Sequence, residues 1–330
     1  MSSPASTSIE AGRGFGLKAA VAAAGLALLA YVLMSKGYLV TVIGFAAIYA
    51  VFCTGLNFFM GYTGQASFGQ SAFAAIGGYG SAILCTDHGW EPALALVAMM
   101  ALSGVVAFIV GYPTLRLRGH YLAMATFALG LIAYEIRIEW TDLTQGYMGY
   151  SGIPPLGIGP YSLPTDKAQL VALVVVALFG VWIASRLRHS RFGRALAAIA
   201  GSESAAMALG VKVSRYKLLA FVVASLYASA AGSLFAHFVG FISPEVFGTQ
   251  MVVLSFTMLY LGGVGTIWGP LIGAVIVSLL PEAMRGLKEL QDVAYTAALI
   301  LILIFAPKGL SGLAPLIGMR GAPDAQVKPR

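Results

Sequence analysis

The chain has 330 residues, of which 59% are hydrophobic and only 10% are charged. An average soluble domain carries about 25% charged residues, and a soluble surface needs more charge than this chain offers. The composition therefore excludes an ordinary cytosolic enzyme. A mean hydropathy of +0.85 also excludes a disordered chain, in spite of 40 glycines and 14 prolines. We expect an all-α, polytopic membrane protein.

Ten apolar segments approach the length of about 20 residues that a helix needs to cross the hydrocarbon core. In chain order they cover 18–35, 38–60, 66–86, 92–112, 121–138, 168–186, 216–238, 249–262, 269–281 and 293–306. Several are short and rich in glycine. Arg13 and Lys18, which precede the apolar stretch of the first segment, are also typical of a signal peptide. No convincing small-residue cleavage site follows, so we interpret this segment as an uncleaved anchor.

The basic residues support ten spans with both termini in the cytoplasm. This arrangement places fifteen of the twenty Lys and Arg residues on the inner side, as the positive-inside rule demands. It predicts an inner tail at 1–17, a transmembrane domain at 18–312 and a second inner tail at 313–330. The longest inner loop is 186–217, and the main outer loop is 139–167.

The predicted spans carry no Asp, Glu, Lys or Arg near their middle. We expect Glu135, Arg137 and Glu139, at the outer end of the fifth segment, to reach water. Proton- or sodium-driven carriers commonly keep an acidic residue at mid-membrane, so the pattern disfavours such a carrier. Backbone carbonyls can also bind sodium, and that alternative stays open. Cys53 and Cys85 lie in apolar runs, and we expect them to be packing residues.

Neutral polar residues and glycines gather in one segment, from Asn57 to Gly80. Glycines let helix backbones approach closely or interrupt regular helix, and the amides and hydroxyls offer neutral donors and acceptors. This combination suits a passage for a zwitterionic or uncharged solute, although helix packing alone also explains it. The candidate passage residues are Asn57, Thr63, Gln65, Ser67, Gln70 and Thr126. A second glycine-rich passage, 261–274, is expected to be a tight turn before a new helix at Gly269-Pro270.

The inner loop contains signals for a short helix. Ser202 is a good N-cap, Glu203 in the first turn favours the helix dipole, and Gly210 supplies a stop. We therefore predict a helix over 202–210, flanked by bends and small enough to dock into a groove of another protein. A basic loop that only fixes topology and meets anionic lipid is the alternative.

Four stretches together resemble the permease family of branched-chain amino acid ABC importers. They are G-Y-T-G-Q-A-S-F-G-Q-S-A-F at 61–73, L-R-L-R-G-H-Y-L-A-M-A-T at 115–126, S-R-F-G-R-A-L with A-A-M-A-L-G-V-K-V-S-R-Y-K-L-L-A-F between 190 and 221, and the late G-G-V-G-T-I-W-G-P and P-K-G-L. The resemblance covers about 38–312. The Y-T-G-Q-A-S form makes the chain more similar to the LivM-type subunit than to its LivH-type partner.

The resemblance implies a transport subunit without its own nucleotide-binding site. It implies a second, LivH-type permease, two cytoplasmic ATPase subunits that hold ATP and Mg, and a periplasmic or lipid-anchored solute-binding protein, in a bacterial inner membrane. No cofactor or nucleic acid is expected on this chain, which lacks the G-x-x-x-x-G-K-[ST] phosphate loop. The residues carried over to ATPase coupling are Arg191, Phe192, Gly193, Arg194, Glu203, Ala206, Leu209 and Gly210. The implied solutes are branched-chain or related amino acids, with urea and short amides as alternatives.

An intramembrane protease is a rival of another class. Gly149-Tyr150-Ser151-Gly152 matches the G-x-S-G pattern of rhomboid-like proteases, and His237 lies in a later span. The tetrapeptide is short enough to arise by chance, and Pro154-Pro155 disfavour a membrane helix that begins at Ser151.

Overall fold

The computed structural model describes residues 37–117, 119–158, 161–284, 296–297 and 299–300. Within them the chain is mostly helical, as predicted. The first predicted segment, most of the tenth, and both tails lie outside the described residues.

Eight of the ten predicted segments coincide with helices. These are α2 (Tyr38–Thr63), α3 (Gln70–Thr86), α4 (Pro92–Thr114), α5 (His120–Glu139), α7 (Asp166–His189), α10 (Val213–Val239), α11 (Thr249–Gly262) and α12 (Gly269–Ala283). Among the described residues, α2, α4, α5, α7 and α10 are long and apolar enough to cross a membrane. The other three are shorter, with 17, 14 and 15 residues. The chain is thus a multi-pass membrane protein.

The third predicted segment begins later than expected. Gly64 ends α2 in the left-handed conformation, with φ of 71°, and its N–H bonds the carbonyl of Met60. Residues 64–69 are then non-helical, and α3 starts only at Gln70. Helix α3 thus begins four residues after the predicted start at 66, because the connection that follows the Gly64 cap extends to Gly69.

Helices α2 and α10 form the centre of the bundle. Their most apolar windows are 78% and 72% buried, whereas those of α4, α5 and α7 are 17%, 22% and 33% buried. Helix α10 packs against α2, α3 and α4, while α2 also packs against α7 and α12. The outer helices expose large apolar side chains, which suits contact with lipid or another subunit.

Small residues allow a close crossing of α3 and α10. A Cβ on Gly77 would clash with the backbone of Ser229, and a Cβ on Gly232 would clash with the backbone of Ala74. Close backbone approach at small residues is a main source of helix association in membranes, where burial from water contributes little.

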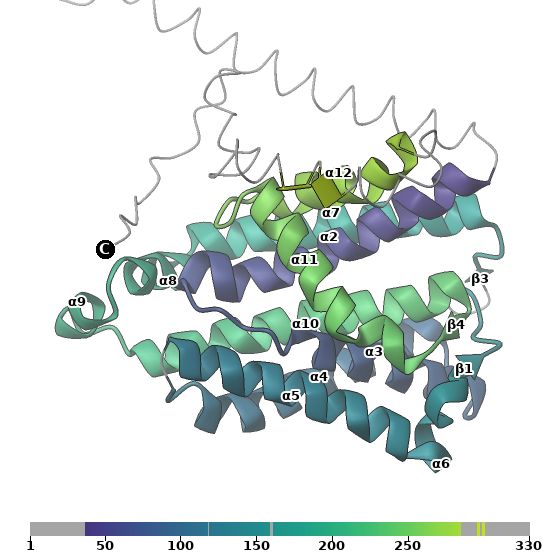
Figure 1. Cartoon of the computed structure of the whole chain (residues 1–330), viewed down its shortest axis with the longest axis horizontal. Coiled ribbons are helices and arrows are strands. Elements are labelled where there is room, and N and C mark those ends of the chain that lie inside the picture. The colour runs from purple at the N-terminus through teal and green to yellow at the C-terminus, as the bar shows by residue number, and fades with distance from the viewer. Residues whose placement is uncertain (1–36, 118, 159–160, 285–295, 298, 301–330) are drawn as a thin grey trace, which may run out of the picture.

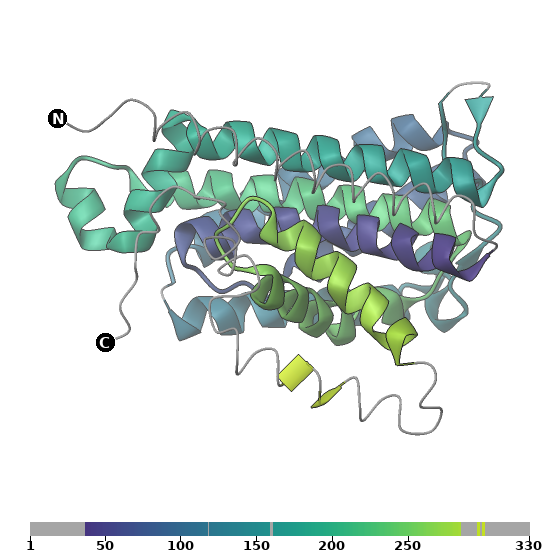
Figure 2. The ribbon, with the colours of Figure 1, turned by 90° about the horizontal axis from the view of Figure 1, so that it is seen from above.

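The polar loops lie at opposite ends of this bundle. One end carries α8 (Arg191–Gly201) and α9 (Glu203–Ala208), which project away from the other helices in both views (Figures 1 and 2). The other end carries the short elements of 139–167, the predicted main outer loop, and of 240–248 (Figure 1). These are α6 (Thr141–Thr144), η1 (Gly146–Met148), η2 (Pro244–Phe247), β1 (Tyr150–Ser151) paired antiparallel with β4 (Phe241–Ile242), and β2 (Gly157–Ile158) paired antiparallel with β3 (Tyr161–Ser162).

Candidate functional site

Helices α8 and α9 form a compact two-helix unit between α7 and α10. Ser190 caps α8 by accepting from the backbone N–H of Phe192 at 3.1 Å, and Ser202 caps α9 by accepting from that of Ala205 at 3.3 Å. Gly210 follows α9 with φ of 82°. The predicted cap and stop of the short helix are therefore confirmed.

Helix α8 was not predicted from the sequence, which led us to expect only bends before Ser202. The signal was present, because Ser190 is a favoured cap and Phe192, Leu196 and Ile199 recur at helical spacing. Leu196 and Ile199 are buried against the bundle. Arg191 and Arg194 lie between these apolar residues and made the segment look like a basic loop.

The eight predicted coupling residues divide into an outward and an inward group. Arg191, Arg194, Leu209 and Gly210 are exposed, and Leu209 keeps 82% of its surface accessible. Gly193 and Ala206 are buried within the chain, and Phe192 is half-buried against the ring of Tyr216, with centroids 6.1 Å apart. The inward residues hold the unit on the bundle, so only the outward group is available to a partner.

Glu203 occupies a third position, between α9 and two other segments. Its carboxylate forms an ion pair with Lys217 of α10, whose side chain is 3% exposed. The same oxygen accepts a hydrogen bond of 3.0 Å from the side-chain amide of Gln65. Gln65 belongs to the glycine-rich connection 64–69. A predicted coupling residue and a predicted passage residue are thus in direct contact.

Asn57 joins the two glycine-rich passages of the chain. Its side-chain amide donates to the carbonyl of Thr266 at 2.7 Å, and its side-chain carbonyl accepts from the N–H of Gly265 at 2.8 Å. The side chain is buried and both ends of its amide are used. Asn57 therefore stabilises the turn between α11 and α12 in this conformation.

Two predicted passage threonines also bond locally. The Thr63 hydroxyl donates to the carbonyl of Phe59, one turn earlier in α2. The Thr126 hydroxyl donates to the carbonyl of Ala123 and accepts from the N–H of Phe68 at 3.1 Å. Thr126 thereby holds the connection 64–69 against α5.

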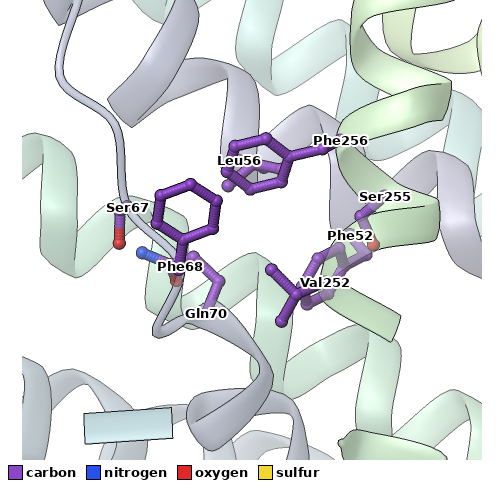
Figure 3. A pocket seen from close by; sticks show the side chains of 8 residues that line it. All are labelled: Phe52, Leu56, Ser67, Phe68, Gln70, Val252, Ser255 and Phe256. Carbon is purple, nitrogen blue, oxygen red and sulfur yellow. The ribbon is translucent and has the colours of Figure 1, made fainter. Parts of the chain in front are cut away.

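Ser67 and Gln70 differ from these four, because their buried side-chain polar atoms have no hydrogen-bond partner. Both line a small cavity between α2, the connection 64–69 and α11 (Figure 3). Phe68 and Phe256 close it, with parallel rings 4.6 Å apart. The cavity is too small for a water molecule, so no open passage exists at this point of the structure.

Arg137 contradicts the expectation that the outer end of α5 reaches water. Its side chain is buried, with only 5% of the residue exposed, whereas Glu135 and Glu139 are exposed. The helix turns Arg137 inward, toward α3 and η2. Position along a span indicates depth, but only packing decides on which side of the helix a residue lies.

The residues proposed for a protease do not meet. His237 is hydrogen-bonded through Nε2 to the Ser81 hydroxyl at 2.7 Å and through Nδ1 to the Pro154 carbonyl at 2.8 Å. Ser151 lies exposed in β1, opposite Phe241. Because both ring nitrogens are engaged elsewhere, the geometry gives no support to a Ser151–His237 pair.

The family match and the similar known proteins agree with one another. Residues 38–306 match the family described as branched-chain amino acid transport system / permease component. The chain is 32% identical over 287 residues to the high-affinity branched-chain amino acid transport system permease protein LivM of Salmonella typhimurium, covering 80% of this chain and 67% of the relative.

Two further relatives are more distant. The chain is 28% identical over 286 residues to the permease protein LivH of Escherichia coli, covering 80% of this chain and 91% of LivH. It is 27% identical over 225 residues to the ribose import permease protein RbsC of Escherichia coli, covering 64% of this chain and 67% of RbsC. No solved structure matches the chain. The greater identity to LivM than to LivH confirms the predicted subtype. The chain belongs to the family of permease components of branched-chain amino acid transport systems.

Proposed function

We propose that the chain is one of two permease subunits of an ATP-driven importer that carries branched-chain or related amino acids across a bacterial inner membrane. The observation that carries the proposal is the match to the permease family over 38–306. The similarity to both LivM and LivH supports a pairing with a second, related permease.

The proposed topology has ten spans with both termini in the cytoplasm. The α8–α9 unit, which carries Arg191 and Arg194, then lies on the inner side, in agreement with the positive-inside rule. The elements of 139–167 and 240–248 lie at the opposite end of the bundle and would receive the solute-binding protein. The domain limits 18–312, with short tails on either side, remain part of this proposal.

We propose that a pair of cytoplasmic ATPases, which bind ATP and Mg, supplies the energy for transport, since this chain lacks the phosphate loop. The exposed group on the α8–α9 unit, with Leu209 and Arg194, would contact one of them. Closure of the ATPase pair would move the unit as a rigid lever. Glu203 then passes the displacement to Lys217 at the base of α10 and to Gln65 beside the passage.

The passage is proposed to run beside the connection 64–69, where Ser67 and Gln70 have unused polar atoms. Their neutral donors and acceptors suit a zwitterion, and the phenylalanine pair over them suits a closed state. Asn57, Thr63 and Thr126 would serve this passage by holding its walls in place.

Reconstitution tests the proposal. The chain, its second permease and its ATPases are placed in liposomes, and uptake of labelled L-leucine is measured with the binding protein outside. Uptake that needs ATP inside and the binding protein outside is expected. Uptake driven by a proton or sodium gradient without ATP would instead identify a secondary carrier. ATP-driven uptake of urea or acetamide, but of no amino acid, would identify the other solute class.

A further inference from the structure

Arg137 is a buried cation without a carboxylate partner. Arg137 forms no ion pair, so no described carboxylate lies within 4 Å of its guanidinium. The guanidinium has five N–H donors, yet its one hydrogen bond goes from a terminal nitrogen to the carbonyl of Phe247 at 3.4 Å. Its buried Nε has no partner.

The surroundings of Arg137 supply a second unused donor. The Tyr79 hydroxyl of α3 is buried and has no hydrogen-bond partner, and it lies within electrostatic range of the guanidinium. The Tyr79 ring packs against Phe247, with centroids 6.2 Å apart. The centroid of the Tyr134 ring lies 5.7 Å from the guanidinium carbon. Helices α3 and α5 and the turn η2 thus surround the guanidinium, and two buried polar groups there, Arg137 Nε and the Tyr79 hydroxyl, have no hydrogen-bond partner.

Helix geometry explains only part of this arrangement. A cation in the last turn of α5 is stabilised by the helix dipole, but an exposed arginine would gain the same benefit. Burying a charge without an anion is costly, and ionisable residues inside membrane proteins usually mark ligand sites or pathways. A guanidinium group with unused N–H donors is suited to bind a carboxylate, because it can donate two parallel hydrogen bonds to the two oxygens.

We propose that Arg137, assisted by the Tyr79 hydroxyl, binds the α-carboxylate of the transported amino acid at the end of the bundle opposite α8 and α9. This inference rests on the proposed function and adds the group that recognises the solute. A cavity between α5 and α11 lies directly beside the site, with Tyr134 and Gly248 in its wall. Phe127, Leu131 and Val252 in the same wall would face the apolar side chain of the solute.

In this conformation the cavity holds about one water molecule, so the solute enters only when α5 and α11 separate. Such a separation is what alternating access provides. Phe68 lines both this cavity and the one beside Ser67 and Gln70. The two cavities therefore mark successive positions on one route, with Phe68 between them.

The carboxylate has two conceivable sources, the solute or an acidic side chain of a neighbouring subunit, and the experiment separates them. The intact importer is purified with Arg137→Gln, Arg137→Lys or Tyr79→Phe. The matched control is Arg116→Gln, because Arg116 also contacts a tyrosine ring, that of Tyr112 at 4.9 Å, but is exposed. The measurements are ATP-driven uptake of L-leucine, subunit co-purification, and the shift in melting temperature caused by L-leucine or by leucinamide, which lacks the carboxylate.

We expect L-leucine, but not leucinamide, to raise the melting temperature of the wild-type complex and of Arg116→Gln. In Arg137→Gln we expect no such shift and a fall in uptake of at least about tenfold, while all subunits still co-purify. In Tyr79→Phe we expect a smaller fall in uptake and a partial shift. Arg137→Lys keeps the charge and recovers only part of the shift.

Two results would overturn the assignment. One is an unchanged leucine shift and unchanged uptake in Arg137→Gln. The other is loss of a subunit from the Arg137→Gln complex, which assigns the carboxylate to that subunit. A wild-type complex that takes up no amino acid with ATP refutes the proposed function itself, and this result is distinguishable from both.

Discussion

The side-chain amide of Gln65 donates a 3.0 Å hydrogen bond to the carboxylate of Glu203, across 138 positions of the chain. Gln65 lies in the non-helical connection before α3, and Glu203 is the first residue of α9. The bond therefore joins the part of the chain proposed to meet the ATPase to the part proposed to meet the solute. Lys217 binds the same carboxylate oxygen and fixes both to the first turns of α10.

Gln65→Ala removes this link with little effect on the rest of the fold. We expect a loss of about 1 kcal/mol in the free energy of unfolding, because one hydrogen bond is lost from a half-buried site. ATP-driven uptake should fall severalfold while ATP hydrolysis continues, since the two events become uncoupled. Normal uptake per ATP hydrolysed in Gln65→Ala would show that the bond transmits nothing.

Glu203→Ala has a larger effect on stability, because it leaves Lys217 buried without its counter-charge. Removing one partner of a buried pair costs about 3–5 kcal/mol, and the partial exposure of Glu203 places the expected loss at the lower end. The double variant Glu203→Gln with Lys217→Met should recover most of it. Thermal unfolding of the purified importer in detergent measures both, and a double variant no more stable than Glu203→Ala would contradict this account.

Charge reversal on the outward side of the α8–α9 unit tests the docking surface. Arg194 is exposed, and its guanidinium donates one exposed hydrogen bond to the His189 carbonyl at 3.2 Å, so Arg194→Glu should leave the fold intact. We expect ATP-driven uptake to drop about tenfold or more, as the lost contact between subunits would be charged. Leu209→Asp should act in the same way, because that side chain is almost free of contacts.

Arg116→Glu, on the exposed α4–α5 connection, is the control for a change of charge alone. Ala206→Leu is the control for a disturbed fold, since Ala206 is buried and a larger side chain there must displace the unit. If Arg194→Glu and Leu209→Asp both leave uptake and ATPase stimulation at the wild-type level, the α8–α9 unit is not the docking element.

Asn57→Leu should destabilise the protein by removing the hydrogen bonds to two half-buried backbone groups. The N–H of Gly265 and the carbonyl of Thr266 both lose their bond to the amide, and each such bond contributes about 0.5–1.5 kcal/mol. Asn57→Asp keeps the acceptor for Gly265 but cannot donate to Thr266 when ionised. Melting temperatures should fall in both variants, and an unaltered melting temperature in Asn57→Leu would exclude the bridging role.

Gly77→Ala should weaken the crossing of α3 and α10. The added methyl group would clash with the Ser229 backbone, and overpacking of this kind costs about 1–3 kcal/mol. Gly201→Ala in α8 is the matched control, because a Cβ there meets nothing within 4 Å. Alanine favours helix by up to about 1 kcal/mol over glycine, so the control should be neutral or slightly stabilising. Equal melting temperatures for the two variants would contradict the proposed tight crossing.

Much of the helical framework was predictable from local sequence. Apolar length predicted eight helices that the structure contains, and Ser202 and Gly210 predicted both ends of α9. These features depend on neighbouring residues: a cap bonds within its own turn, and hydrophobic length is a property of one segment. The family resemblance followed from short motifs and needed no coordinates.

Tertiary structure decided what each polar residue does. Polarity and depth alone placed Asn57, Gln65 and Gln70 in one passage, but packing directs Asn57 to the α11–α12 turn and Gln65 to α9, and leaves Gln70 at a cavity. The same limit applies to Arg137, whose place at the end of α5 suggested water while the fold buries it. Hydropathy fixes how deep a residue lies. The partner of a polar group depends on which distant segment packs against it, and that information lies in the arrangement of the helices.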